Sequence, residues 1–397
     1  MAHLSKRNFL KKIALAGLAG AAFSPEVKAG ISDTEEIQKR KLQTRVLGRT
    51  GLKVPVMSSG ALPVENINLV REIFKSGIRH VDSALVYKEG KNDEMVGKML
   101  KEFGRKKFIV ASKVQNDFDY TAKKFLSDNI GREFETKLDR ILSLMQTDYL
   151  DILYVHDARC REQALHPEIM AAAEKAKKAG KTRFIGISTH ENIPEVVQAA
   201  CEAGIYDVVL ASYNFRSGEE VKKAFAMAVE HGMGTVAMKT LAGGYLDKER
   251  TKPVNMTAAL KYVLQDPNVH TIIKGIYTFE DLKKIMEVAS DIRMTGEEEK
   301  ALEEAKQYAG LYCKGCTVCL PMCPKNLPIP DMMRAYMYTY GYGEPLRGKE
   351  LVTKHGIEPS VCNDCEECTV RCAMGFSVKE RIRDIARLRD VPDEFLA

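Results

Sequence analysis

The sequence has no tract in which Lys and Arg are concentrated, although the formal net charge of its 397 residues is +6. A nucleic-acid-binding face needs such a concentration, so we expect no nucleic-acid partner. Its Gly/Ala-rich apolar stretch near the N-terminus, Ile13 to Phe23, is also short. A helix needs about 20 apolar residues to span a bilayer, so this stretch does not predict a membrane anchor.

The rest of the composition fits a soluble globular protein, with 45% hydrophobic and 29% charged residues. The chain has room for a domain of about 250 residues and for extensions. Cysteine is the unusual feature, because eight of the ten cysteines fall in two tight clusters after Tyr312. This distribution favours metal binding over a scattered set of disulfides.

The N-terminal segment resembles an export signal. Residues 5–11, SKRNFLK, follow the twin-arginine pattern with Lys6 in place of the first arginine, and Val27 to Ala29 fit a cleavage site. We expect residues 1–30 to be a signal peptide that the export machinery recognises, and residues 31–42 to be a charged linker. The protein is then periplasmic or otherwise exported. The alternative is a basic leader on a cytoplasmic protein.

The sequence after the linker alternates between strand and helix patterns, beginning with a hairpin whose turn lies at Thr50 and Gly51. Strands are expected at 56–60, 79–82, 108–113, 150–156, 184–188, 207–212, 235–239 and 269–274. Helices are expected at 66–76, 92–102, 120–144, 167–179, 193–203, 218–231, 255–265 and 278–289. This alternation predicts an α/β fold, a (β/α)8 TIM barrel over residues 43–295. A doubly wound open sheet is less favoured, because no G-x-G-x-x-G motif follows the first strand.

Polar side chains stand at the ends of three successive predicted strands. Asp82 and Tyr87 follow the second strand, Lys113 ends the third and His156 ends the fourth. In a barrel of this kind, the C-terminal ends of the strands and the loops after them build the active site. Alone, such an Asp is more often a helix cap and such a Tyr more often a core residue. Together the residues supply a proton donor, groups that tune it and an imidazole that orients a substrate, which are the parts of a carbonyl-reducing site.

Several motifs stand in order around these residues: DSALVY, NDEMVGKML, ASKV, TDYLDILYVHD, RFIGIS and LAGG. Over roughly residues 43–286 the sequence thereby resembles the aldo-keto reductases. The resemblance implies that Asp82, Tyr87, Lys113 and His156 form a catalytic tetrad. We assign Tyr87 as general acid/base for an aldehyde, ketone or sugar-like substrate. Because tyrosine has a pKa of about 10, Lys113, paired with Asp82, must adjust it, while His156 orients the substrate oxygen.

The resemblance also implies a nicotinamide cofactor, NADP or NAD. Ser188 matches a position that holds the carboxamide, and Leu241 to Gly244 match a loop that encloses the phosphates. The family's Asn, Gln and stacking residue are replaced by Thr189, Leu210 and Met238, and no Arg for a 2′-phosphate is evident. These departures leave the choice of cofactor open. The expected cofactor-binding residues are Ser188, Tyr213, Lys239, Leu241, Gly243 and Gly275.

Two runs of cysteines share the spacing C-x2-C-x2-C-x3-C, and Pro324 follows the first run. This spacing is typical of 4Fe-4S clusters. Zinc prefers two pairs with a longer gap, and cysteines this close form disulfides poorly, so both are less favoured. We expect residues 296–397 to form a small α-helical ferredoxin-like domain with two clusters, between which Cys323 and Cys372 could be exchanged. The expected ligands are Cys313, Cys316, Cys319, Cys323, Cys362, Cys365, Cys368 and Cys372.

Two functions are consistent with these features. The leading interpretation is a carbonyl oxidoreductase with a small-molecule substrate and a redox partner protein reached through the clusters. The alternative is an electron-transfer protein whose barrel is a degenerate scaffold. The complete tetrad favours the enzyme, whereas the altered cofactor positions favour the electron carrier. Clusters that only stabilise the C-terminal region are a third interpretation.

Overall fold

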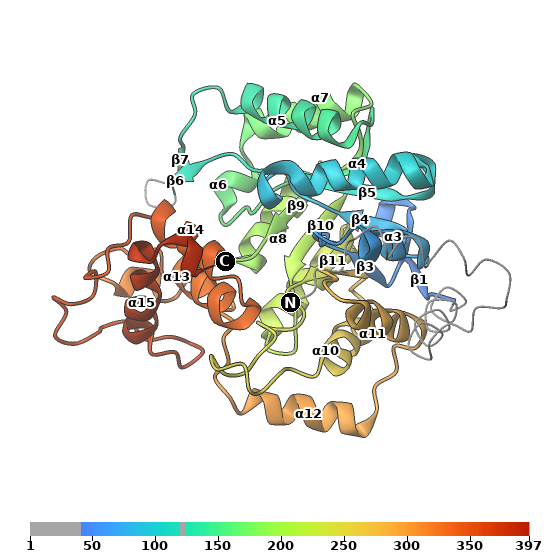
Figure 1. Ribbon diagram of the computed structural model, residues 1–397. Helices are drawn as coiled ribbons and strands as arrows, with labels where there is room; N and C mark the ends of the chain where they lie inside the picture. Colours follow the sequence, from blue (N-terminus) through green and yellow to red (C-terminus); the bar gives the residue numbers. More distant parts are fainter. Residues whose placement is uncertain (1–40, 120–123, 397) are drawn as a thin grey trace, which may run out of the picture. The chain divides into compact units, whose positions relative to one another are not determined.

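Eight parallel strands close into a barrel in the computed structural model (Figure 1). The structure describes residues 41–119 and 124–396, so the predicted signal peptide and most of the predicted linker lie outside the described residues. The strands follow their sequence order around the barrel, and β10 pairs with β9 as well as with β11. They are β3 (Met57–Ser59), β4 (His80–Asp82), β5 (Ile109–Val114), β8 (Leu150–Val155), β9 (Thr182–Thr189), β10 (Val208–Ser212), β11 (Gly234–Met238) and β12 (Thr271–Lys274). The predicted TIM barrel is thereby confirmed.

The barrel interior is filled by apolar side chains from several strands, among them Ile152, Leu210 and Val236. The hairpin of β1 (Thr44–Val46) and β2 (Lys53–Pro55) contributes to the same core cluster and closes the N-terminal end of the barrel. Its turn ends at Gly51, at a positive φ of 66° that glycine tolerates. The opposite end, where the strands finish, is the end at which barrel enzymes carry their active sites.

The predicted helices lie between the strands, with one difference. They are α3 (Ile67–Lys75), α4 (Lys91–Phe103), α5 (Ile130–Met145), α7 (Pro167–Lys178), α8 (Ile193–Ala203), α9 (Glu219–Glu230), α10 (Met256–Gln265) and α11 (Phe279–Ser290). The prediction that α5 begins near residue 120 is wrong. A small antiparallel sheet, β6 (Phe118–Asp119) with β7 (Lys124–Phe125), precedes it. The turn-forming residues Ser127, Asp128 and Asn129 lie between this small sheet and the first residue of α5.

The C-terminal region is helical, as predicted for a ferredoxin-like domain. Its helices are α12 (Gly296–Lys306), α13 (Ile329–Tyr336), the π-helix η5 (Met337–Tyr342), α14 (Pro345–Lys354) and α15 (Val378–Ala386). The barrel contains one short α-helix that the sequence did not predict, α6 (Arg161–Ala164). Phe215, Ala242 and Ala258 of the barrel share one apolar core with Met332 and Ile385 of this region. The chain from Lys41 onward therefore forms one compact unit.

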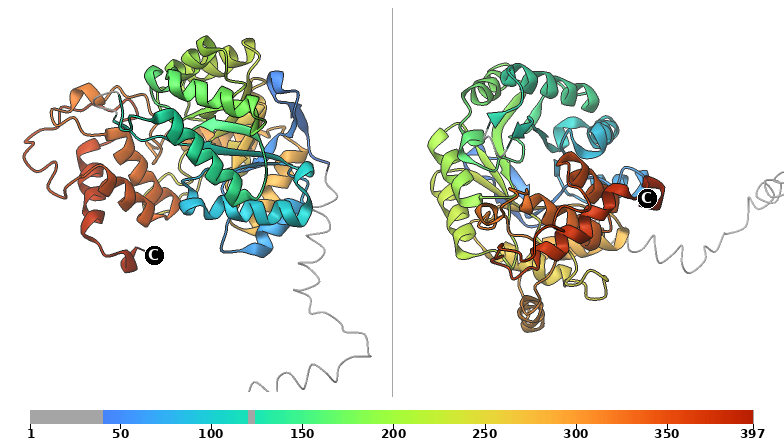
Figure 2. Two further views of the ribbon diagram at one scale, coloured as in Figure 1. Left: turned by 90° about the horizontal axis from the view of Figure 1, so that it is seen from above. Right: turned by 90° about the vertical axis from the view of Figure 1, so that its left-hand side faces the viewer.

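The C-terminal helices lie across the end of the barrel at which the strands finish (Figure 2). The backbone N-H of Asn192, just after β9, donates to the carbonyl of Gly315 at 2.9 Å. The loop after β11 contacts η5, because a Cβ placed on Gly341 would lie 2.4 Å from the carbonyl oxygen of Gly243. No helix in the described part of the chain has both the length and the apolar character needed to cross a membrane.

Candidate active site

The tetrad residues lie together where β4, β5 and β8 end. The Lys113 ammonium donates to the Asp82 carboxylate and, at 2.6 Å, to the carbonyl oxygen of Ser83. Its nitrogen lies 5.2 Å from the centre of the Tyr87 ring. The ring centres of Tyr87 and His156 are 6.2 Å apart, with the rings nearly perpendicular. Three strands thus deliver four chemically distinct groups to one place.

Helix α4 fixes the loop that carries Tyr87. Asn92, which is buried, donates to the Ser83 hydroxyl at 2.7 Å and accepts from the Leu62 backbone N-H at 2.7 Å. One turn of the helix therefore ties the segment after Asp82 to the loop after β3. The hydroxyl of Ser112 donates to Asp93 at 3.1 Å in the same way. These contacts explain why the NDEMVGKML segment accompanies the tetrad in the sequence.

Burial and the buried ion pair set the protonation states at the site. Burial raises the pKa of Tyr87, while the charge of Lys113 opposes this rise. Burial disfavours the charged form of Lys113, yet the neighbouring Asp82 and Tyr87 raise its pKa overall. Burial, assisted by Lys113, lowers the pKa of His156 to about 3. At neutral pH the site therefore holds a protonated phenol, a charged lysine beside it and a neutral imidazole, so it contains a proton donor and a neutral hydrogen-bond donor.

Lys239 follows β11 in the left-handed region, with a φ of 57°. Its ammonium lies 4.9 Å from the ring centres of both Tyr338 and Tyr342, which belong to η5. In the described ranges, no carboxylate lies within ion-pair distance of it. Lys239 also lines a pocket between the barrel and the C-terminal region. The other lining residues are His190, Glu191, Ser212, Tyr312, Cys313, Gly315, Pro330, Arg334 and Met337.

The remaining predicted cofactor residues have different surroundings. The Ser188 hydroxyl accepts from the backbone N-H of Asp157 at 3.0 Å, so it supports the segment that follows His156. The buried phenol of Tyr213 donates to Asp266 at 2.7 Å, and its ring packs against Phe225 of α9. The Tyr213 side chain thus belongs to the layer between strands and helices. The prediction that it faces a cofactor does not fit this position, because sequence does not show to which side a strand-end residue turns.

The loop Leu241 to Gly244 is covered by the C-terminal region. A Cβ placed on Gly243 would lie 3.4 Å from side-chain atoms of Leu311 and of Met337. At Gly275, after β12, an added Cβ would lie 2.7 Å from the hydroxyl of Tyr277. Both glycines therefore allow close packing around the barrel opening. Lys239 stands at the start of this loop, where its carbonyl oxygen accepts from the Ala242 N-H at 3.0 Å, and its ammonium is a cation that could meet a phosphate.

Sequence reasoning missed the contribution of the C-terminal region to the barrel opening. Burial raises the pKa of Tyr87, and the charge of Arg347, from the C-terminal region, acts against this rise. The Arg347 guanidinium lies 3.9 Å above the Tyr338 ring and donates to its hydroxyl at 3.2 Å. The signal was the run AYMYTYGYG, in which Tyr338 and Tyr342 stand four residues apart and therefore face the same side of a helical turn.

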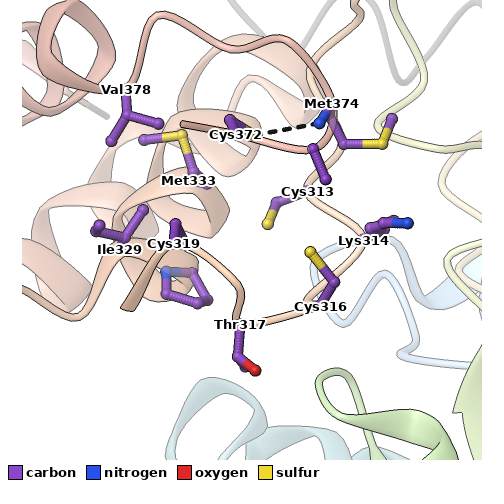
Figure 3. Close-up of a pocket in the computed structure, with 12 residues that line it drawn as sticks. Cys313, Lys314, Cys316, Thr317, Cys319, Ile329, Met333, Cys372, Met374 and Val378 are labelled. Carbon is purple, nitrogen blue, oxygen red and sulfur yellow. Dashed lines mark hydrogen bonds between the residues drawn. The ribbon is translucent and has the colours of Figure 1, made fainter. Parts of the chain in front are cut away.

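The eight clustered cysteines form two groups, each of which takes its fourth member from the other run. Cys313, Cys316, Cys319 and Cys372 line one pocket (Figure 3), and we name this group site A. The thiols of Cys323, Cys365 and Cys368 all act on the pKa of Cys362, and we name these four residues site B. The structure thus brings the cysteines together in the exchanged arrangement that the spacing left open.

The donor set of site A fits an iron-sulfur cluster. Apolar side chains such as Ile329 and Met333 line its wall, and the backbone N-H of Met374 donates to the Cys372 sulfur at 3.4 Å. Burial raises the pKa of Cys313 to about 12, so its thiolate needs the positive charge that iron supplies. No three His, Cys, Asp or Glu side chains in the described residues are close enough together to hold a single metal ion. A 4Fe-4S cube binds its thiolates at separate corners, so it requires wider spacing than a single ion does.

Comparison with known proteins agrees with this division of the chain. Residues 59–258 match the aldo/keto reductase family, and residues 312–377 match a 4Fe-4S dicluster domain. The chain is 25% identical over 308 residues to L-galactose dehydrogenase of Arabidopsis thaliana, covering 67% of this chain and 94% of that protein. It is 26% identical over 197 residues to a methylglyoxal reductase of Escherichia coli O157:H7, covering 49% of this chain and 69% of that protein.

A solved structure with the same fold is the holo form of an aldo-keto reductase from Bacillus halodurans. It aligns with a TM-score of 0.55 at 22% identity, over 67% of this chain and 96% of that one. The family match spans half of the chain, and it includes the barrel strands from β4 to β11 and the strand ends that carry the tetrad. The chain is therefore an oxidoreductase that belongs to the aldo/keto reductase family and carries a 4Fe-4S dicluster domain after its barrel.

Proposed function

We propose that the protein interconverts a carbonyl compound and its alcohol by nicotinamide hydride transfer, with Tyr87 as general acid/base. The observation that supports this most strongly is the contact of the Lys113 ammonium with Asp82, beside the rings of Tyr87 and His156. Bound NADPH or NADH would supply the hydride. The geometry of these side chains is suited to moving the accompanying proton.

In the reductive direction, the Tyr87 hydroxyl donates its proton to the carbonyl oxygen as negative charge develops there. The neutral imidazole of His156 donates a hydrogen bond to the same oxygen and holds it in place. Lys113 stabilises the phenolate that Tyr87 leaves, and Asp82 keeps the Lys113 ammonium in position. In the oxidative direction the same groups act in reverse, with the phenolate as base.

The proposed cofactor-binding residues are Ser188, Lys239, Leu241, Gly243 and Gly275. Lys239 would meet a phosphate, because no carboxylate of the described residues lies within ion-pair distance of its ammonium. We leave Tyr213 out, because its phenol is bonded to Asp266. The choice between NADP and NAD stays open. Two relatives are named for a sugar and for a small oxoaldehyde, which supports aldehydes, ketones or sugar-like carbonyls as the substrate class.

The C-terminal region would hold two 4Fe-4S clusters, one in site A and one in site B. Their thiolate ligands would be the cysteines of each group, and the clusters would supply one-electron transfer to a redox partner protein. Site A lies beside the barrel, because its ligand Cys313, together with Gly315 of the same loop, lines the pocket that contains Lys239. This proximity supports a role for the clusters in the same enzyme.

We also propose that residues 1–30 direct export and residues 31–42 form a linker before the barrel (43–295) and the ferredoxin-like domain (296–397). A fusion of residues 1–42 to a folded reporter tests this proposal. Substitution of Lys6 and Arg7 by Gln is expected to retain the reporter in the cytoplasm. Equal export of both fusions would contradict a twin-arginine signal.

Anaerobically purified protein tests the enzymatic proposal. We expect nicotinamide fluorescence to report binding of NADPH or NADH, and a panel of aldehydes, ketones and sugars to contain a substrate that oxidises it. Failure of both assays, with iron and sulfide present and reversibly reducible, would favour the electron-transfer alternative. The packing of Gly243 against the C-terminal region is the observation that favours this alternative.

A further inference from the structure

One residue, Asn192, joins the loop of site A to the barrel. Its backbone N-H donates to the carbonyl of Gly315 at 2.9 Å, and its side-chain oxygen accepts from the Thr317 hydroxyl at 3.2 Å. Gly315 and Thr317 both lie between cysteines of site A. The side-chain nitrogen of Asn192 donates to the carbonyl oxygen of Arg159 at 3.2 Å. The oxygen of the Asn192 amide therefore contacts the loop of site A, and its nitrogen contacts the barrel.

Arg159 continues this connection to the residue that follows His156. Its guanidinium donates to one carboxylate oxygen of Asp157 at 2.7 and 3.1 Å. It also donates to Asp331 of α13 at 2.7 Å. Arg334, from the same helix, contacts Asp157 at 3.4 Å. The segment after His156 is thus held by charges that the cluster-binding region helps to place.

The backbone along this connection is conformationally demanding. Asp157, Asn192 and Thr317 all have a positive φ, of 53°, 51° and 58°, which costs free energy for residues with a Cβ. At Gly315 an added Cβ would lie 2.6 Å from the carbonyl oxygen of His190, so only glycine allows the loop to approach this closely. The surrounding contacts must stabilise these conformations. Loss of one of these contacts is therefore expected to weaken the neighbouring contacts along the connection.

We propose that Asn192 is a positioning residue through which the folded loop of site A orients the His156 segment. It touches no reacting group itself. An ordered site A would thereby support carbonyl reduction without any electron passing from cluster to substrate. This inference rests on the proposed function for its kinetic consequence, but the structural coupling can be measured separately.

The variant Asn192→Gly tests this proposal in the full-length protein with its clusters. Glycine tolerates the left-handed backbone and keeps the N-H to Gly315, whereas both side-chain hydrogen bonds are lost. We expect kcat for carbonyl reduction to fall about 10-fold, as is typical when a supporting contact of a site is removed. We expect hydrogen exchange at the amides of Asp157 and Ala158 to accelerate, because these amides are bonded to Ser188 in the intact site.

Three companion variants sharpen the result. Asn326→Gly is the matched control, because Asn326 is also left-handed, at a φ of 50°, and lies in the cluster-binding region outside this connection. Asn326→Gly should have the kcat and the hydrogen exchange of the wild type. Thr317→Ala removes the hydroxyl that Asn192 accepts from and should lower kcat, whereas Thr317→Ser keeps the hydroxyl and should restore it.

Iron content and the electron paramagnetic resonance spectrum of the reduced clusters are measured on every variant. The proposal predicts that Asn192→Gly keeps both while kcat and amide protection fall. Unchanged kcat and unchanged exchange with intact clusters would overturn it, and so would loss of iron, since Asn192 would then serve cluster assembly alone. If the wild type reduces no carbonyl with nicotinamide, the proposed function fails, and the hydrogen exchange alone decides the coupling.

Discussion

The ammonium of Lys113 and the carboxylate of Asp82 form an ion pair in which each side chain is only 1% exposed. A buried pair contributes little net stability relative to apolar residues, but removal of one partner leaves an uncompensated charge. We therefore expect Lys113→Met to destabilise the protein by about 3–5 kcal/mol. Urea unfolding followed by circular dichroism measures this change.

The double variant Lys113→Met with Asp82→Asn also removes the uncompensated carboxylate charge, and it should recover part of the stability that Lys113→Met loses. Lys175→Met is the matched control, because Lys175 pairs with Glu135 at the surface and its side chain is 69% exposed. A surface pair of this kind contributes about 0–1 kcal/mol. Equal stability of the single and double variants would contradict the buried-charge explanation.

The pH dependence of catalysis follows from the protonation states at the site. Because the pKa of His156 is lowered to about 3, the imidazole is neutral throughout the neutral range, and we expect no inflection from His156 in kcat/KM between about pH 5 and 8. An inflection of kcat/KM near pH 6.5 that disappears in His156→Gln would contradict this expectation.

Alcohol oxidation should depend on pH in the opposite sense to carbonyl reduction, because it needs Tyr87 as a phenolate. Burial raises the pKa of Tyr87 and Lys113 opposes the rise, so Lys113→Met should raise it further. The rise of the oxidation rate with pH is therefore expected to move to higher pH in this variant. A shift to lower pH would exclude Lys113 as the group that lowers the pKa of Tyr87.

The grouping of the cysteines predicts which substitutions remove the same cluster. Cys313→Ser and Cys372→Ser should lose one electron paramagnetic resonance signal and about half of the iron, since both residues line site A. Cys323→Ser and Cys362→Ser should lose the other signal, because both belong to site B. A Cys372→Ser spectrum that matches Cys362→Ser would show that each run binds its own cluster.

Lys239 is predicted to bind a cofactor phosphate. A hydrogen bond to a charged group contributes about 1.5–3 kcal/mol, so Lys239→Met should weaken dinucleotide binding by at least about 10-fold. Fluorescence titration with NADPH and NADH measures the dissociation constants. The exposed Lys248 gives the control variant Lys248→Met, whose affinity should equal that of the wild type. Unchanged affinity in Lys239→Met would remove Lys239 from the proposed site.

The barrel and the position of the tetrad could be predicted because both follow from local patterns. Each strand is a short apolar run, and parallel strands in a closed barrel must end at one rim, so Asp82, Lys113 and His156 converge whatever the loops do. The spacing of the cysteines carries similar local information. It left open which run completes which site, because that depends on how the two loops face each other.

The run AYMYTYGYG signals a helical face of tyrosines, but the place where the C-terminal region contacts the barrel could not be predicted from the sequence. Contacts such as Gly341 against Gly243, or Lys239 beside Tyr338, join segments about 100 residues apart and depend on side-chain shape rather than on periodicity. The surroundings of Tyr213 could not be predicted for a related reason. A strand-end residue can turn toward the opening or toward the helices, and its partner Asp266 is distant in sequence.

The central claim is that the Tyr87 hydroxyl transfers the proton to the substrate oxygen. The most direct test compares carbonyl reduction by the wild type and by Tyr87→Phe, with nicotinamide binding and cluster content measured on the same samples. General acid/base groups contribute about 10²–10⁴-fold to rate, so we expect kcat to fall by at least about 100-fold while nicotinamide affinity and iron content are unchanged. Substantial turnover by Tyr87→Phe with intact clusters would contradict the account.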